Sequence, residues 1–289
     1  MSESEAQGDR SATAAEEVGR RLRMDLHVHT LASDGIDDVE TILAAAVARR
    51  LDVVAITDHE RVDAALAARA MAEGRGLPLE VIVGEEISTR GGHLLGLFLA
   101  RRIRPWQSIR ASIAQVHEQG GLAIIAHPLP PWPLCASEGT IRRLMDEADP
   151  IHQPDGLEGF NPTTARMRPS RRAPALAEEL GIAAVAGSDA HRAANVGAAV
   201  TLIRGERAAD LRAAIAARDT AWEGAAYTWQ GQLRMFAQQQ RKNAQAVADE
   251  VGGRLRRDGT GRDLGYPGGR ARPARFDRAA AGLAEDERT

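Results

Sequence analysis

Short apolar runs alternate with longer, Ala-rich segments from residue 23 to about residue 222. Runs such as 52–57 (DVVAIT) and 122–126 (LAIIA) are typical of buried β-strands, because they are short and continuous and end at polar residues. Segment 37–50 (DDVETILAAAVARR) has acids at its start and arginines at its end, the charge order that favours an α-helix. Strands alternating with helices of this length predict βα units around a parallel sheet.

The same pattern gives a set of expected elements. The expected strands are 23–29, 52–57, 79–83, 93–99, 122–126, 156–160, 182–187 and 198–203. The expected helices are 37–50, 61–75, 105–119, 140–148, 171–180 and 207–218. Strands in this number and order favour a closed α/β barrel over an open sheet.

Composition divides the chain further. Residues 1–21 are polar and lack the apolar core of a signal peptide, so we expect a disordered leader before a barrel over 22–223. Residues 224–251 predict a polar helical appendage, and 252–289, rich in Gly and Arg, predict a disordered tail. No apolar run is long enough to span a bilayer, so we expect a cytoplasmic protein with no membrane partner. The oligomeric state is left open.

Overall charge and cysteine content narrow the chemistry. The net charge of −3 gives no sign of a general polyanion binder. The chain has one cysteine, Cys135, so a metal site must be built from His, Asp and Glu.

Metal-ligand residue types recur where the expected strands end. His27 and His29 have i, i+2 spacing, as do Asp189 and His191, and this spacing puts both side chains on one face of a strand. The other candidates are Asp34, Asp58, His59, Glu85, Glu86, His93 and His127. In α/β barrels the carboxyl ends of the strands form the active-site mouth, so we expect these groups to converge.

A mixture of imidazole and carboxylate suits Zn²⁺, Mn²⁺ or Fe²⁺, and the number of ligands is sufficient for two or three ions. Clustered divalent ions activate a water and clamp a phosphoryl group. The sequence contains neither GxSxG nor a Walker A loop, so no nucleophilic serine or nucleotide loop competes with this interpretation.

Five motifs in order resemble the polymerase and histidinol phosphatase (PHP) family across residues 23–222. They are HVHTLASDG (27–35), ITDH (56–59), GEEIST (84–89), AHP (126–128) and GSDAH (187–191). The resemblance implies a distorted (β/α)7 TIM-like barrel that hydrolyses phosphoesters at a site with two or three metals.

The resemblance also implies roles for individual residues. It gives the first metal to His27, His29, Glu86 and Asp189, the second to Glu86, His93 and His127, and the third to Asp34, His59 and His191. Glu86 is chosen over Glu85 because it directly precedes Ile87-Ser88-Thr89. A metal-bridging hydroxide would attack phosphorus, with Asp189, Glu86 and His191 as catalytic residues and Asp189 moving the proton.

Other residues are given less specific roles. Arg192, Arg166 and Arg168 are candidate phosphate clamps, whereas Arg171 and Arg172 are expected on a solvated helix face. Asp58 is expected to support the site from outside and Glu85 to be only its neighbour. His117 and His152 are expected at the surface, and Cys135 is expected to be incidental.

Three functions follow from these expectations. The first is a phosphoesterase acting on a small phosphorylated substrate, such as a nucleotide or histidinol phosphate. The second is a 5′-to-3′ exonuclease on short RNA or DNA, with nucleic acid as a substrate only; the aromatic content of 3% argues against a stacking groove. The third is a catalytically silent module, against which the filled ligand positions argue.

Overall fold

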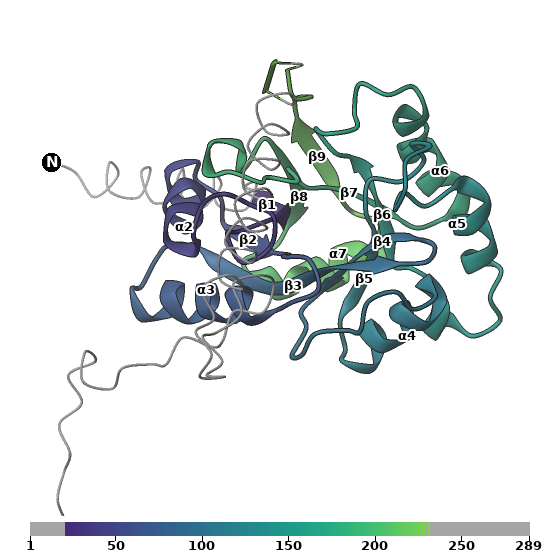
Figure 1. Ribbon diagram of the computed structural model, residues 1–289, viewed down its shortest axis with the longest axis horizontal. Coiled ribbons are helices and arrows are strands. Elements are labelled where there is room, and N and C mark those ends of the chain that lie inside the picture. Colours follow the sequence, from purple (N-terminus) through teal and green to yellow (C-terminus); the bar gives the residue numbers. More distant parts are fainter. Residues whose placement is uncertain (1–20, 229, 232–289) are drawn as a thin grey trace, which may run out of the picture. The chain divides into compact units, whose positions relative to one another are not determined.

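The computed structural model describes residues 21–228 and 230–231, and its strands form one mixed sheet (Figure 1). The strands are β1 (Arg21–Val28), β2 (Val53–Ile56), β3 (Glu80–Thr89), β4 (Gly92–Leu97), β5 (Leu122–Ile125), β6 (Gly156–Phe160), β7 (Ala183–Ala186), β8 (Ala199–Arg204) and β9 (Ala221–Gly224). The helices are α2 (Val39–Ala48), α3 (Asp63–Gly74), α4 (Ile109–Glu118), α5 (Glu138–Met145), α6 (Ala173–Leu180) and α7 (Leu211–Ala217), with short 3₁₀ turns η1 (Pro150–His152), η2 (Pro169–Arg172), η3 (Ala193–Asn195) and η4 (Ala208–Asp210).

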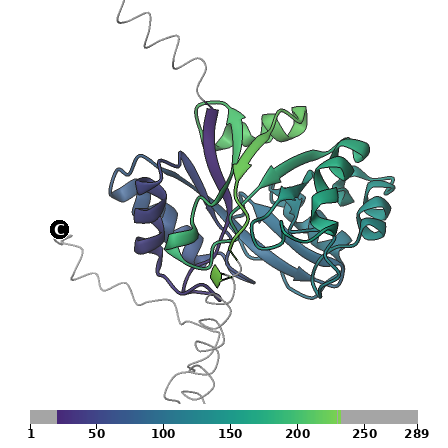
Figure 2. The ribbon, with the colours of Figure 1, turned by 90° about the horizontal axis from the view of Figure 1, so that it is seen from above.

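The sheet curls into a nearly closed barrel. Its strand order is β7-β6-β5-β4-β3-β2-β1-β8-β9. The chain just after β7 returns to β1, where Val28 and Ala190 form a parallel bridge and the His29 amide donates to the Ala190 carbonyl at 2.8 Å. Helices α2 and α3 lie on one side of the barrel and α4 to α6 on the opposite side (Figure 2). The expected barrel is therefore confirmed.

The sequence pattern predicts a parallel sheet, but the observed sheet is mixed. Strand β4 runs antiparallel to both β3 and β5, and β8 runs antiparallel to β1. Only Arg90 and Gly91 separate β3 from β4, and a parallel crossover needs many more residues than a hairpin. Strand β3 also continues to Thr89, so Glu85 and Glu86 lie within the strand and not after it.

Apolar side chains fill the barrel interior below the site. The cluster includes Met24 and Leu26 of β1, Ile82 of β3, Ile124 of β5 and Val185 of β7, all at most 2% exposed. Helix α7 packs onto the same cluster. Close packing of these apolar side chains holds in place the strands that carry the polar residues of the site.

Some expected segments extend beyond the described residues. Arg21 already belongs to β1, and residues 1–20 of the expected leader lie outside the description. Gly224 belongs to β9, residues 225–228 form no helix, and residues 230 and 231 are helical. The rest of the expected appendage and the tail 252–289 lie outside the described residues. No helix in the described part of the chain is long and apolar enough to cross a bilayer.

Candidate metal centre

A β-bulge in β1 turns His27, within the strand, and His29, just after it, into the barrel. Asp25 pairs with Val54 of β2 and Val28 with Ile56, so two β1 residues, Leu26 and His27, lie opposite a single β2 residue. Leu26 faces the apolar interior, and the extra residue lets His27 and His29 face the interior as well. Bulges re-aim side chains in this way beside functional sites.

Glu86 is the hub of the site. Strand β3 puts its side chain on the interior face with Ile82, and the carboxylate is almost fully buried. Five imidazoles surround it: His27 Nε2 at 3.1 Å, His29 Nε2 at 3.1 Å, His59 Nε2 at 3.5 Å, His93 Nδ1 at 2.7 Å and His127 Nε2 at 3.0 Å. The Glu86 carboxylate on β3 therefore contacts imidazoles that lie in or just after three other strands, β1, β4 and β5, and one in the β2–α3 connection.

The donor atoms gather into three overlapping clusters. Within each cluster the ligand atoms lie within 4.8 Å of one another. The clusters are His27, His29 and Asp189; His59, Glu86 and His93; and His29, Asp34, His59 and His191. His127 adjoins them through Glu86, and its Nε2 lies 3.5 Å from His93 Nδ1. The structure thus brings all the expected ligand residues together at one place.

Burial and mutual attraction shift the pKa values of these groups. Burial acts to lower the pKa of His27, but the carboxylates of Glu86, Glu158 and Asp189 outweigh it and raise that pKa well above its ordinary value. Burial would raise the pKa of Glu86, yet the surrounding imidazoles hold it well below its usual range. Without a cation, histidine protons therefore balance the buried carboxylates.

His59 is the exception among the imidazoles. Burial lowers its pKa to about 4, helped by the neighbouring imidazoles of His29 and His93, although Glu86 and Asp34 act in the opposite direction. Its ring is neutral near pH 7 and so has a lone pair for a cation.

Several imidazole nitrogens lack directed hydrogen bonds. His29 Nδ1, His29 Nε2 and His59 Nδ1 are buried without a hydrogen-bond partner in the described part of the chain. Buried polar atoms are ordinarily satisfied, and such exceptions call for an explanation. A donor set of imidazole and carboxylate with unsatisfied nitrogens fits divalent transition-metal ions.

Glu158 supports the centre, and sequence analysis missed it. Its Oε1 lies 2.9 Å from His27 Nδ1, and its Oε2 accepts from the His127 amide at 2.7 Å and from Asn161 Nδ2 at 2.9 Å. The side chain is fully buried. The available signal was a glutamate inside the apolar strand GLEGF, where charged residues are rarely buried without partners.

Asp58 and Asp25 fix the loops that carry ligands. Asp58 accepts from Thr30 N at 2.8 Å and from Ser33 Oγ at 2.5 Å, so it holds the loop that bears Asp34. Asp25 accepts from the amides of Ser188 at 2.9 Å and Gly197 at 2.7 Å. Burial raises the pKa of Asp25 to about 6, although these hydrogen bonds oppose the shift.

Glu85 faces away from the centre, as alternation along β3 requires. Its Oε2 accepts from the Ile103 amide at 2.8 Å, and burial raises its pKa to about 8. Near neutral pH Glu85 is therefore protonated and Glu86 is ionised.

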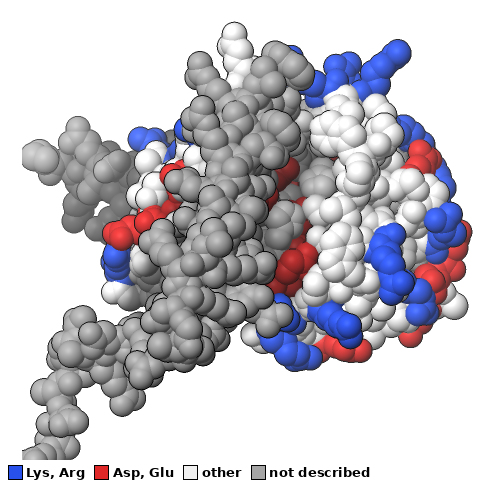
Figure 3. All heavy atoms as spheres, viewed as in Figure 1, with Lys and Arg blue, Asp and Glu red and all other residues white. Residues whose placement is uncertain are grey.

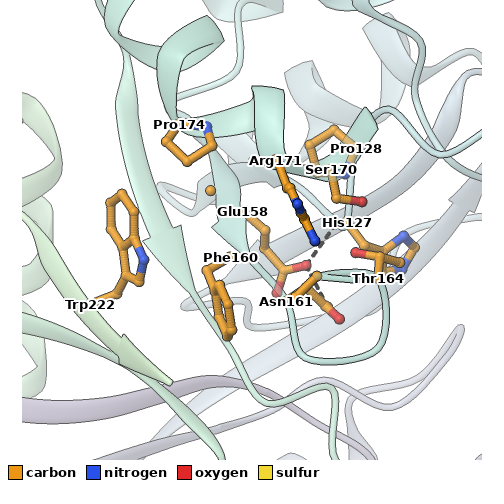
Figure 4. Close-up of a pocket in the computed structure, with 12 residues that line it drawn as sticks. His127, Pro128, Glu158, Phe160, Asn161, Thr164, Ser170, Arg171, Pro174 and Trp222 are labelled. Atoms are coloured by element: carbon orange, nitrogen blue, oxygen red, sulfur yellow. Dashed lines mark hydrogen bonds between the residues drawn. The ribbon is translucent and has the colours of Figure 1, made fainter. Parts of the chain in front are cut away.

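A pocket of about 240 Å³ adjoins the centre (Figure 4). Its lining includes His127, Glu158 and Asn161, which adjoin the centre, and Arg171, whose side chain reaches toward Glu158 and Asn161 (Figure 4). Arg171 is exposed in η2, as expected for a solvated helix face, but it also lines the pocket, which sequence analysis did not foresee.

The three arginines expected as phosphate clamps do not line this pocket. Arg166 is exposed and donates through Nε to the Tyr227 carbonyl at 2.9 Å. Arg168 is exposed before η2. Arg192 is half-buried, and its Nε has no hydrogen-bond partner among the described residues.

Two residues expected to be unimportant make specific contacts. Cys135 Sγ lies 3.5 Å from His127 Nδ1, so the thiol contacts an expected ligand residue. His117 is half-buried, with Nε2 2.9 Å from Asp155 Oδ2 and Nδ1 2.8 Å from the Ile151 carbonyl, so it ties α4 to the connection before β6. His152 is also only partly exposed.

A barrel-shaped α/β sheet with clustered imidazoles and carboxylates at its mouth defines a candidate metalloprotein. Comparisons with known proteins agree with this class. The model of the PHP domain matches residues 25–130, and a PHP-associated model matches residues 168–220. An uncharacterized protein of Methanocaldococcus jannaschii is 34% identical over 151 residues, which cover 48% of this chain and 82% of that protein.

Two further matches are more distant or shorter. A 5′-3′ exoribonuclease, Rnm, of Salmonella typhimurium is 49% identical over 65 residues, 22% of each chain. A solved two-domain protein from Bacteroides vulgatus, described as containing a predicted PHP-like metal-dependent phosphoesterase, has a TM-score of 0.58 at 19% identity over 76% of this chain and 70% of its own. The chain belongs to the PHP family.

Proposed function

We propose that this protein is a metal-dependent phosphoesterase that hydrolyses a small phosphorylated substrate. The observation that carries the proposal is the convergence of five imidazoles on the Glu86 carboxylate, with Asp34, Asp189 and His191 in the overlapping clusters. A purely structural core would not assemble so many ionisable groups in one buried place, because each must be desolvated.

The overlapping clusters support a site for two or three divalent ions. His27, His29, Glu86 and Asp189 would hold the first, Glu86, His93 and His127 the second, and Asp34, His59 and His191 the third. Mn²⁺, Fe²⁺ or Zn²⁺ suits this donor set. Such ions, when bound, lower the pKa of a water and neutralise phosphate oxygens.

The chain's own residues supply proton transfer and orientation. Asp189 has Oδ1 within 3.4 Å of His29 Nε2, and Asn161 Nδ2 donates to its Oδ2 at 3.4 Å. We assign to Asp189 the removal of a proton from the attacking water and its delivery to the leaving oxygen. Glu158 Oε1 accepts a hydrogen bond from His27 Nδ1, which keeps a proton on that nitrogen and leaves Nε2 as the ligand atom.

The size of the pocket and the surface charge favour a small substrate. A cavity of about 240 Å³ is below the usual range for drug-sized ligands, so it suits a small leaving group. On the part of the face in Figure 3 that grey atoms do not cover, basic and acidic side chains are interspersed. An extended nucleic acid would be bound more readily along a continuous basic track.

One observation favours exonuclease activity as a second candidate. Trp106 and Trp132 are 58% and 47% exposed. Trp106 N donates to the Ser88 carbonyl at 2.7 Å, and Ser88 Oγ lies 3.3 Å from His93 Nε2. An exposed indole beside the centre offers a stacking surface for a base. The exoribonuclease relative points in the same direction.

An activity screen of purified protein with measured metal content tests the proposal. The substrates are nucleoside mono- and bisphosphates and histidinol phosphate, set against 5′-phosphorylated oligonucleotides. We expect turnover of the small phosphoesters and its loss in His29→Ala, with His152→Ala as the matched histidine control. Faster turnover of oligonucleotides would favour the exonuclease. Absence of both turnover and bound metal would favour a silent module.

A further inference from the structure

The pocket beside the centre contains a guanidinium group without a partner. In Figure 4 the Arg171 side chain points from η2 into the pocket, on the side where Glu158 and Asn161 lie. The guanidinium makes neither a hydrogen bond nor an ion pair with any residue that the structure describes. The neighbouring Arg172 differs, because its Nη2 pairs with Glu179 at 2.6 Å. Arg171 is thus available to an anion that enters the pocket.

Ser170 offers a second polar group on the same wall. Its residue is 8% exposed, and its Oγ is buried without a hydrogen-bond partner among the described residues. A buried hydroxyl without a partner is uncommon, and a ligand that accepts its hydrogen bond would satisfy it. Ser170 and Arg171 both line the pocket and lie adjacent in the chain.

Glu158 lies near Arg171 in the pocket but forms no ion pair with it. Both of its oxygens already accept hydrogen bonds, from His27 on one side and from His127 and Asn161 on the other. The remaining walls are largely apolar and include Phe160, Pro174 and Trp222. The pocket therefore combines flat apolar surfaces with the Arg171 guanidinium and the Ser170 hydroxyl, neither of which has a side-chain partner among the described residues.

We propose that this pocket binds the leaving group of the substrate and that Arg171 and Ser170 bind a second anionic group on it. The anion is a carboxylate or a second phosphate, since a guanidinium pairs with either, and Phe160 and Trp222 contact a flat ring. This inference rests on the proposed phosphoesterase function. It makes Arg171 a determinant of specificity for substrates with two anionic groups.

Three matched aryl phosphates test the proposal in the full-length, metal-loaded protein. They are phenyl phosphate, 4-carboxyphenyl phosphate and 1,4-phenylene bisphosphate, which share a ring and differ in the second anion. We expect kcat/KM for at least one dianionic compound to exceed that for phenyl phosphate by about tenfold to hundredfold, as one charge-assisted hydrogen bond allows. The compound preferred identifies the anion as carboxylate or phosphate.

Two variants and a control localise the preference. Arg171→Gln should bring the ratio of kcat/KM values between the dianionic compound and phenyl phosphate close to one. Ser170→Ala should lower the ratio by a smaller factor, about threefold. Arg69→Gln, the same change on the exposed face of α3, should keep the ratio of the unmodified protein. Equal kcat/KM values for all three compounds, or a preference that survives in Arg171→Gln, would overturn the proposal.

A binding measurement separates this inference from the proposed function. Saturation-transfer NMR with 4-hydroxybenzoate and phenol reports occupancy of the pocket without turnover. We expect 4-hydroxybenzoate to bind the unmodified protein and Arg69→Gln but not Arg171→Gln. Binding through Arg171 without phosphoester turnover would leave the subsite standing and remove the proposed function. Turnover with no dependence on Arg171 in either measurement would do the reverse.

Discussion

Glu158→Gln is the most informative single substitution, because it changes the support of the metal centre and none of its expected ligands. The carboxylate of Glu158 accepts from His27 Nδ1 at 2.9 Å through Oε1, and from the His127 amide and Asn161 Nδ2 through Oε2. A glutamine has one acceptor oxygen and one amino group. Its oxygen will face the two donors at the Oε2 position, and its amino group will face His27 Nδ1.

That orientation reverses the tautomer of His27. The ring must then accept at Nδ1 and carry its proton on Nε2, the nitrogen that faces Glu86 and Asp189. Substitution of such supporting residues typically weakens metal affinity or activity by about tenfold to hundredfold, or about 1.4–2.7 kcal/mol. We expect this loss in a metal titration followed by calorimetry, with an unchanged circular dichroism spectrum. Glu178→Gln, on the exposed face of α6, is the control. Unchanged affinity in Glu158→Gln would refute the tautomer argument.

Two further predictions concern stability and steric fit. The hydrogen bond to Asp155 raises the pKa of His117 above 6.5, so its stabilisation is fully present below that pH and is lost as pH rises through the folded-state pKa. His117→Gln should therefore lower the free energy of unfolding by about 1 kcal/mol at pH 6, and by less at pH 9, in urea titrations; an equal loss at both pH values would contradict this. A Cβ added at Gly187 would lie 2.5 Å from His27 Cβ, so we expect Gly187→Ala to displace His27 and to lose bound metal. Gly139→Ala, where the added Cβ meets only ordinary contacts, should keep its metal. Full metal content in Gly187→Ala would contradict this, because it would mean that the backbone shifts without disturbing the site.

The candidate ligands followed from elementary regularities of the sequence, whereas the distorted barrel and the assignment of ligands to each metal followed from the resemblance to the PHP family. Strand periodicity put His27 and His29 on one face, and Glu86 was chosen over Glu85 because it directly precedes Ile87-Ser88-Thr89. The direction of β4 was predicted wrongly, because hydrophobic runs carry no direction. The two-residue connection at Arg90 and Gly91 was the available signal for a hairpin.

Other features depend on three-dimensional contacts that local sequence does not encode. The bulge at Leu26 and His27 depends on the register between β1 and β2, and no residue type in this segment predicts it. Arg171 was assigned to solvent because it belongs to a charged stretch. Its place in the pocket arises from the path of the chain between β6 and α6, which brings η2 over His127 and Glu158. For Glu158 the sequence shows only a charged residue within an apolar strand, and it does not show that His27 and His127 are its partners.

Metal analysis of a matched pair of glutamate variants tests the central claim most directly. Glu86→Gln removes the carboxylate that contacts five imidazoles, whereas Glu85→Gln changes the adjacent buried carboxyl, whose pKa of about 8 already makes it neutral at pH 7. After reconstitution with Mn²⁺, Fe²⁺ or Zn²⁺, we expect two or three ions per chain in the unmodified protein and in Glu85→Gln, and a clear loss in Glu86→Gln. Equal metal content in the two variants, or no bound metal in the unmodified protein, would contradict the account.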